Sequence, residues 1–385
     1  MRSNIMKMDK LLLLLTAFMF ILGLFMILSA SSVKASLYGE PYHYFIRQSI
    51  ILFISFIGFM VITYFPLNFF KKISLLLVFI VLGLLIGVNA YGIVANKAQS
   101  WLSLGFFNLQ PSEFVKTAII LYMASYYDKH YRSTNFMTIL FPLLIALIMA
   151  GFVYIQPDFG TFSIIAFITF FLFISIPINK EIKNNILKYG IVALIVGALF
   201  LLATDNTLLK SGQISRLNYQ HPCSNYLSGG KGYQVCNGFI AINSGGLWGV
   251  GLGDSTQKYL YLPEAHTDFI FAITLEELGL VFGIVIVLIY MTILFLILRI
   301  ALRSKRLMGS IIAYGTALYI FIHLAINIAG VLGIIPLTGI PLPFLSYGGS
   351  YALNLVILLA LVQKVEIQNK IDIQKRYLMG EKEQE

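Results

Sequence analysis

The chain contains a series of apolar stretches, each about 20 residues long, separated by short polar segments. An α-helix of about 20 residues, rising 1.5 Å per residue, is what crosses the hydrocarbon core of a bilayer. The composition agrees, since 58% of the residues are hydrophobic and only 11% are charged, against about 25% in soluble domains. The sequence therefore predicts an all-α polytopic membrane protein with ten spans, at 11–31, 48–66, 73–94, 111–127, 137–155, 160–178, 187–204, 269–298, 309–330 and 348–364.

The net charge of +10 raises the question of a nucleic-acid partner, and the positions of the basic residues answer it. Most of the 27 lysine and arginine residues lie in segments that fall on one side when the N-terminus is inside. The positive-inside rule then orients the chain with both termini in the cytoplasm. We therefore expect no nucleic-acid binding. The basic residues left outside are Lys34, Arg47, Lys97, Lys210, Arg216, Lys231 and Lys258.

We expect residues 1–385 to form a single membrane domain. The first apolar stretch is longer than the 7–15 residues of a signal-peptide core, so we expect it to be retained as an anchor. The longest hydrophilic stretch, about 205–268, is a large outer loop between the seventh and eighth spans, and about 365–385 is a cytoplasmic tail. Glycines interleaved with aromatic and aliphatic residues between Gly229 and Gly253 favour an ordered cover over a cavity.

The only two cysteines, Cys223 and Cys236, both fall in this outer loop. They are a candidate disulfide in an oxidising compartment, and free thiols are the alternative. No Cys and His spacing resembles a zinc site. The run from Gly245 to Gly253 lacks the Lys-Ser/Thr ending of a phosphate-binding loop, so we expect no nucleotide there.

Acidic residues gather where the eighth span begins. The 19-residue stretch 261–279 contains Glu264, Asp268, Glu276 and Glu277, together with His266, although the chain has only 17 acidic residues. Carboxylates at the mouth of a span are costly and usually functional. A helix entry near His266 would put Asp268 at the membrane surface, where a carboxylate can act as a general base, and Glu276 about 12 Å deeper. Residue chemistry alone leaves a membrane enzyme and a transporter equally open.

Three further places carry polar chemistry in apolar surroundings. Glu113 and Lys116 are i,i+3 neighbours on one helix, either as a buried pair or in a polar cavity. Asp158 follows Pro157 in a short turn, where it can cap the next helix. The segment 330–350 contains too many prolines for a regular helix, and such backbone survives at membrane depth only where protein or a wet cavity covers it. We expect it to line the same cavity as Asp268.

Seven motifs follow one another along the chain. They are Gln110-Pro-Ser-Glu113 with Lys116, Gln156-Pro-Asp158, Gly232-Tyr-Gln234, Ser244-Gly-Gly246, Tyr261-Leu-Pro-Glu-Ala-His-Thr-Asp-Phe-Ile-Phe-Ala272, Glu276-Glu-Leu-Gly279 and Pro341-Leu-Pro-Phe-Leu-Ser-Tyr-Gly-Gly-Ser350. In this order they resemble the motifs of the SEDS family (shape, elongation, division and sporulation), which includes the FtsW and RodA types. The stretch 262–266 and the surroundings of Trp101 are slightly closer to the FtsW type.

The resemblance implies a ten-span fold and peptidoglycan glycosyltransferase activity on the outer face of the bacterial cytoplasmic membrane. Such an enzyme polymerises lipid II and releases undecaprenyl pyrophosphate. The resemblance makes Asp268 the general base and puts Glu113 and Lys116 in the cavity beneath it. Cations must neutralise the leaving group, and Arg216 and Lys231 are the candidates, with Lys258 less favoured.

Other residues follow from the same resemblance. A divalent cation, Mg²⁺ or Mn²⁺, would suit a pyrophosphate leaving group, but no ligand set in the sequence marks a metal site. Further substrate-binding candidates are Gln234, His266 and Ser346, and cavity-lining or structural candidates are Trp101, Asp158, Glu264, Glu276 and Glu277. One departure concerns Trp101, because Gln99 and Ser100 stand where FtsW-like members carry basic residues. That weakens a donor-phosphate role for this loop.

The partner implied is a class B penicillin-binding protein, a transpeptidase, together with other divisome or elongasome proteins. The sequence does not separate division from elongation or sporulation. The alternative function is a lipid II flippase or a non-catalytic scaffold of the cell-wall machinery. Asp268 discriminates between them, since a polymerase needs its carboxylate and a scaffold tolerates asparagine.

Overall fold

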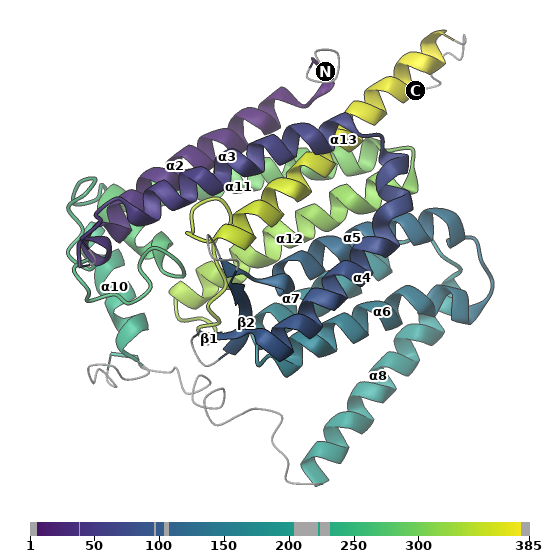
Figure 1. Cartoon of the computed structure of the whole chain (residues 1–385), viewed down its shortest axis with the longest axis horizontal. Helices are drawn as coiled ribbons and strands as arrows, with labels where there is room; N and C mark the ends of the chain where they lie inside the picture. The colour runs from purple at the N-terminus through teal and green to yellow at the C-terminus, as the bar shows by residue number, and fades with distance from the viewer. Residues whose placement is uncertain are drawn as a thin grey trace.

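The computed structural model describes residues 6–37, 39–95, 98–103, 108–203, 222–223 and 232–378. Within these residues the chain is almost entirely helical, with one small sheet (Figure 1). In order, the elements are α2 (Lys10–Ser36), α3 (His43–Tyr64), α4 (Leu67–Tyr91), β1 (Ile93–Ala95), β2 (Ala98–Ser103), β3 (Asn108–Leu109), α5 (Pro111–His130), α6 (Phe136–Ile155), α7 (Phe159–Ser175), α8 (Lys180–Ala203), α10 (Tyr233–Gly245), α11 (Ile270–Arg303), α12 (Leu307–Val331) and α13 (Gly349–Leu378).

A helix occupies each of the ten predicted spans. Among the described residues, seven helices are long and apolar enough to cross a membrane, namely α2, α3, α4, α6, α11, α12 and α13. α7 is apolar but has 17 residues. α5 is less apolar because charged and hydroxyl side chains interrupt it, and other helices bury most of its length. The prediction of a helical, multi-pass membrane protein is confirmed in this coarser form.

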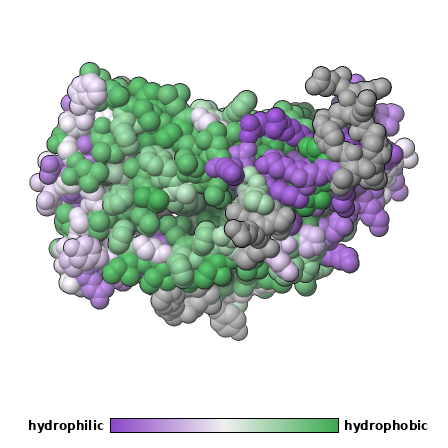
Figure 2. All heavy atoms as spheres, turned by 90° about the horizontal axis from the view of Figure 1, so that it is seen from above, coloured by the Kyte–Doolittle hydropathy of each residue, from purple (hydrophilic) through white to green (hydrophobic). Residues whose placement is uncertain are grey.

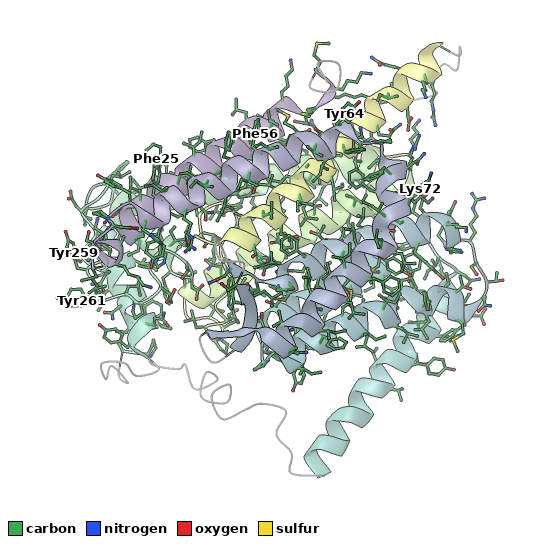
Figure 3. All side chains as sticks on the ribbon, viewed as in Figure 1. Phe25, Phe56, Tyr64, Lys72, Tyr259 and Tyr261 are labelled. Carbon is green, nitrogen blue, oxygen red and sulfur yellow. A yellow bond between two sulfur atoms is a disulfide. The ribbon has the colours of Figure 1, made fainter. Side chains whose placement is uncertain are left out.

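The helices other than α8 and α10 form a bundle in which the two ends of the chain lie at one end and α10 lies at the other (Figure 1). Gln363 of α13 joins the two ends of the chain, because its side chain accepts from the N–H of Asp9 at 2.9 Å and donates to the Asp9 carbonyl at 3.0 Å. Labelled side chains mark the two ends of the bundle: Tyr259 and Tyr261 lie at the α10 end, and Lys72 lies towards the other end (Figure 3).

The surface of the bundle is mostly apolar along its length, with the hydrophilic side chains concentrated towards the ends (Figure 2). α8 projects away from the bundle and is attached near its start (Figure 1). There the Lys183 ammonium donates to the carbonyls of Ile174 and Ile176 at 2.8 and 2.7 Å. A broad apolar belt between polar ends is what a bilayer requires of the protein that it surrounds.

A small antiparallel sheet, ordered β1-β2-β3, precedes α5 and was not predicted. Trp101 pairs with Ile93, and Leu102 pairs with Leu109. The hydroxyl of Ser100 donates to the Gln156 carbonyl at 3.4 Å. The fold is helical as predicted, and this sheet is a local addition that the Ser100 hydrogen bond joins to the turn between α6 and α7.

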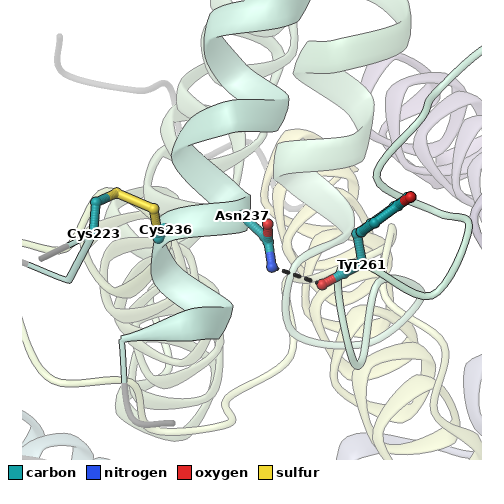
Figure 4. The surroundings of a disulfide bond; sticks show 4 residues. All are labelled: Cys223, Cys236, Asn237 and Tyr261. Atoms are coloured by element: carbon teal, nitrogen blue, oxygen red, sulfur yellow. Dashed lines mark hydrogen bonds between the residues drawn. A yellow bond between two sulfur atoms is a disulfide. The ribbon is translucent and has the colours of Figure 1, made fainter. Parts of the chain in front are cut away.

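The predicted outer loop contains the helix α10, which a disulfide between Cys223 and Cys236 ties to the preceding chain (Figure 4). The side chain of Asn237, next to the disulfide, donates to the Tyr261 carbonyl at 2.8 Å. α10 is thus fastened on one side to residue 223 and on the other to the segment that leads to Asp268. Arg216 and Lys231 lie outside the described residues.

α11 is interrupted at Gly279, whose φ of 83° and ψ of 170° are not helical. Around the break, the carbonyls of Glu276 and Glu277 accept from the N–H groups of Val250 and Gly251 at 2.9 and 3.1 Å. In return, the N–H groups of Leu280 and Val281 donate to the carbonyls of Gly246 and Leu247 at 3.0 and 3.2 Å. A segment of the glycine-rich loop therefore replaces the hydrogen bonds that the helix loses.

Glycine is required on both sides of this contact. A Cβ added to Gly249 would lie 2.2 Å from the Glu277 carbonyl oxygen, and one added to Gly279 would lie 2.4 Å from the Gly249 nitrogen. The expectation of a regular helix starting near His266 was therefore wrong in two respects. The helix begins at Ile270, after Asp268, and it is broken nine residues further on.

Candidate active site

Asp268 lies in the turn immediately before α11 and is half-buried. Three successive carbonyls of this turn are held from the C-terminal part of the chain. The His266 carbonyl accepts from the Tyr347 N–H at 2.9 Å, and the Thr267 carbonyl accepts from the Ser346 hydroxyl at 2.6 Å. The Asp268 carbonyl accepts from the Asn327 amide of α12 at 2.9 Å. The turn is positioned by other elements, not by a helix of its own.

A small pocket adjoins Asp268. The same Asn327 amide also donates to the Ile340 carbonyl at 2.9 Å, which brings the chain before α13 against the site. Gly339, with φ of 73°, passes so close that a Cβ there would lie 3.4 Å from Oδ2 of Asp268. The predicted placement of the 330–350 segment beside Asp268 is confirmed. The pocket is lined by Asp268, Ile326, Asn327, Gly330, Leu337, Thr338, Gly339 and Ile340.

His266 is enclosed, with 3% of its surface exposed. Its ring packs against Tyr44, with centroids 4.5 Å apart, and against Tyr347 at 5.6 Å. Burial, helped by the nearby Lys34 ammonium and opposed by Glu264, lowers the pKa of His266 to about 4. The imidazole is therefore neutral at physiological pH. The packing of this ring against Tyr44 was not predicted from the sequence.

Two cations, Lys34 and Arg47, lie beside this cluster. Lys34 and Glu264 form a partly exposed ion pair at 3.5 Å. Arg47 interacts with Tyr347; burial raises the pKa of that phenol and Arg47 opposes the rise. Lys258 is different, because it is 6% exposed and its ammonium contacts the Glu277 carboxylate at 3.3 Å and the Gly253 carbonyl. Lys258 is therefore engaged inside the protein.

Glu276 and Glu277 are fully buried and hold the loop in the break of α11. The Glu277 carboxylate also accepts from the Ser29 hydroxyl of α2 at 2.5 Å. Glu276 accepts hydrogen bonds from neutral donors only, which are the hydroxyls of Ser244, Ser255 and Thr256 and the N–H groups of Thr256 and Gln257. Both glutamates make structural contacts.

Glu113 and Lys116 form a buried pair at 2.8 Å, with 3% and 1% of their surfaces exposed. A third member comes from α12, since Nε2 of His323 lies 3.2 Å from the Lys116 ammonium. The other ring nitrogen, Nδ1, lies 2.8 Å from the Tyr319 carbonyl. Because a carbonyl only accepts, Nδ1 carries the proton, and Nε2 accepts from Lys116. Sequence reasoning missed His323, which lies 207 residues from Lys116.

The remaining residues predicted from the sequence are Asp158, Trp101, Gln234 and Ser346. Asp158 caps α7 as predicted, accepting from the Thr161 N–H at 3.0 Å. Trp101 is half-buried on β2. Gln234 donates to the Pro263 carbonyl at 3.1 Å, and the Ser346 hydroxyl both donates to Thr267 and accepts from the Leu342 N–H. In this structure these two polar side chains support the turn that carries Asp268.

The fold and the site together define a multi-pass helical membrane protein with a carboxylate at a pocket near one end of its bundle. A model of the FtsW/RodA/SpoVE family, described as cell cycle proteins, matches residues 9–371. The chain belongs to this family.

Curated relatives agree with that membership. A probable peptidoglycan glycosyltransferase FtsW of Bacillus subtilis is 38% identical over 88% of this chain and 84% of its own length. A protein of the same description from Hydrogenovibrio crunogenus is 34% identical over 92% of this chain and 90% of its own length. The stage V sporulation protein E of B. subtilis is 35% identical over 89% and 92%.

Two solved structures share the fold. A chain of a peptidoglycan synthase complex superposes with a TM-score of 0.75 at 23% identity, covering 94% of this chain and 98% of that chain. The rod shape-determining protein RodA of Thermus thermophilus superposes with a TM-score of 0.67 at 24% identity, covering 93% of this chain and 96% of that one. At these identities the likeness is one of fold.

Proposed function

We propose that this chain is a peptidoglycan glycosyltransferase that polymerises lipid II, with Asp268 as the general base. The observation that carries the proposal is the position of Asp268. This residue is half-buried at a pocket, and its backbone carbonyl accepts a hydrogen bond from the Asn327 amide. The naming of relatives at 34–38% identity as probable peptidoglycan glycosyltransferases supports it.

In the reaction, the Asp268 carboxylate takes the proton of the acceptor sugar's 4-hydroxyl while that oxygen bonds to the anomeric carbon of the donor. The bond from that carbon to the pyrophosphate oxygen breaks, and undecaprenyl pyrophosphate leaves with the bonding electrons. A base held in place contributes about 10²–10⁴-fold to such a step. His266, two residues before Asp268, is neutral at physiological pH and so adds no positive charge to this turn.

The leaving group needs positive charge. We propose Arg216 and Lys231, joined by Arg47, which stands within the described residues beside Tyr347. Lys258 is dropped from this role, since it is buried against Glu277. Among the described residues, no three His, Cys, Asp or Glu side chains are grouped to hold a metal ion. A divalent cation, if one takes part, would be held chiefly by the pyrophosphate.

We propose that all ten long helices cross the bacterial cytoplasmic membrane as one domain, with both termini inside and Asp268 outside. The basic excess on the side of the termini supports this orientation. A class B penicillin-binding protein is the proposed partner, because a structural neighbour belongs to a complex that coordinates polymerization and crosslinking.

The test is glycan-strand formation from lipid II by the purified full chain with its transpeptidase partner. We expect Asp268→Asn to lose about 10²–10⁴-fold in rate, while Asp254→Asn, an exposed acid of the same outer region, keeps wild-type activity. Equal polymer from Asp268→Asn and wild type would refute the catalytic role. Lipid II translocation by both forms would then favour the flippase, and its absence the scaffold.

A further inference from the structure

The loop that fills the break in α11 presents an exposed apolar surface that the candidate active site does not use. Of the charged side chains near it, those of Glu276, Glu277 and Lys258 are turned inward and buried, whereas Asp254, which follows the loop and lies beside Gly251, is exposed. The loop's own side chains that are turned outward are apolar. They are Leu247, Trp248, Val250 and Leu252, which are 59%, 79%, 43% and 61% exposed.

Irregular backbone can lie in an apolar medium only where its polar groups are paired. Here the carbonyls of Gly246 and Leu247 and the N–H groups of Val250 and Gly251 are paired with α11. The N–H of Gly249 donates to the Gly245 carbonyl at 2.7 Å. These peptide groups therefore need no hydrogen bonds from the surroundings, and the loop presents its side chains outward.

Burial along α11 changes at the level of this loop. Protein buries every residue from Ile270 to Glu277, whereas exposed side chains recur with helical spacing from Leu280 onwards. The apolar run 280–298 is about 28 Å long at 1.5 Å per residue, close to the ~30 Å of a hydrocarbon core. The loop is hydrogen-bonded to the first two residues of this run, so it lies where the exposed apolar face of α11 begins.

We propose that residues 247–252 contact lipid at the edge of the hydrocarbon core nearest Asp268, with Trp248 between the acyl chains and the headgroups. The bilayer is the occupant because the exposed surface of residues 247–252 continues that of α11 and contains no charged side chain; the first exposed charge, Asp254, follows two residues after the loop. Tryptophan is enriched at this level of membranes. The proposal concerns how the protein sits in the membrane, and it stands whether or not the chain is a polymerase.

The chain has only two tryptophans, Trp101 and Trp248, which makes the position measurable. Trp101→Phe leaves Trp248 as the single tryptophan, which is excited selectively over tyrosine, and Trp248→Phe is the matched control that leaves Trp101. The full chain is placed in phosphatidylglycerol-containing vesicles with nitroxide-labelled lipids. We expect nitroxides near the top of the acyl chain to quench Trp248 several-fold more than those at its end, and aqueous acrylamide to quench it weakly.

Strong quenching of Trp248 by acrylamide with none by lipid nitroxides would overturn the proposal, because the loop would then face water. Shielding from both quenchers would overturn it as well, because protein, either a second copy or another chain, would then cover the loop. If Trp101→Phe does not fold, subtracting the Trp248→Phe signal from that of the wild type gives the same quantity.

Discussion

The carbonyl oxygen of Glu276 accepts its hydrogen bond from the N–H of Val250, at 2.9 Å, and not from Leu280 four residues along its own helix. Leu280 donates instead to Gly246, at 3.0 Å. The two segments thus exchange hydrogen bonds as neighbouring strands do. This exchange determines where α11 breaks and why glycines gather in the loop.

Gly279→Ala should destabilise the protein by more than about 3 kcal/mol. The backbone conformation of Gly279 is nearly exclusive to glycine, and a Cβ would meet the Gly249 nitrogen at 2.4 Å. Gly253→Ala is the control, because Gly253 also has positive φ but open space around it, so only about 1–2 kcal/mol of strain is expected. Thermal unfolding in detergent compares the two, and equal losses would show that close packing at the break is unimportant.

Substitutions of Glu276 test whether its negative charge or its capacity to accept hydrogen bonds stabilises the loop. One carboxylate oxygen accepts four of the five hydrogen bonds, all from neutral groups. Glu276→Gln keeps that acceptor and should cost about 1 kcal/mol. Glu276→Leu removes the acceptor of the buried Gln257 N–H and of the partly buried Thr256 N–H and should cost more, at about 1–3 kcal/mol for each group. Unfolding temperatures measure both, and a Gln variant as unstable as the Leu variant would assign the role to charge.

The buried pair of Lys258 and Glu277 should show strong coupling in a double-mutant cycle. Removing either partner leaves the other as an unpaired buried charge, which costs about 3–5 kcal/mol. The double variant Lys258→Met/Glu277→Met should lose much less than the sum of the single losses. The exposed pair of Arg306 and Asp372 provides the control cycle, with coupling of about 1 kcal/mol or less. Additive losses at the buried pair would contradict the ion pair.

His266 should make stability depend on pH below neutrality. Its pKa is lowered to about 4 by burial, below the usual value of 6.5, so between these pH values the unfolded chain binds a proton that the folded chain does not. Stability is therefore fully present above pH 6.5 and falls as the pH drops towards 4, by at most roughly 3 kcal/mol. Unfolding measured along this range should lose that component in His266→Gln and keep it in His43→Gln, a change at the exposed start of α3. A loss of the same size in both variants would point to another group.

Local signals in the sequence predicted the helices well. Ten apolar stretches of span length each became a helix, and Asp158 capped α7, because hydrophobic length and capping depend on neighbouring residues. The break at Gly279 was not predictable in this way, since it depends on a loop about 30 residues earlier in the chain. The same holds for His323 against Lys116 and for the pairing of Trp101 with Ile93.

At the site, too, local sequence signals were predictive and tertiary contacts were not predictable. The acidic cluster was visible as an anomaly of composition, yet its members have separate tasks that only tertiary contacts reveal. Glu276 and Glu277 fasten the loop, while Asp268 stands at a pocket. Lys258 was predicted to be an outer cation and is a buried partner of Glu277. The sequence around a lysine does not show which residue its ammonium contacts in the folded chain.

The turn of Asp268 is suspended from three points outside α11, at Asn327, Ser346 and Tyr347. Asn327 belongs to α12, and the other two belong to the segment that leads into α13. A shift of α12 or α13 relative to α11 would therefore displace the Asp268 carboxylate without any substitution in the pocket. A partner protein that binds those helices would therefore move the proposed general base, and a substitution in them, far from the pocket, would change the reaction rate by the same route.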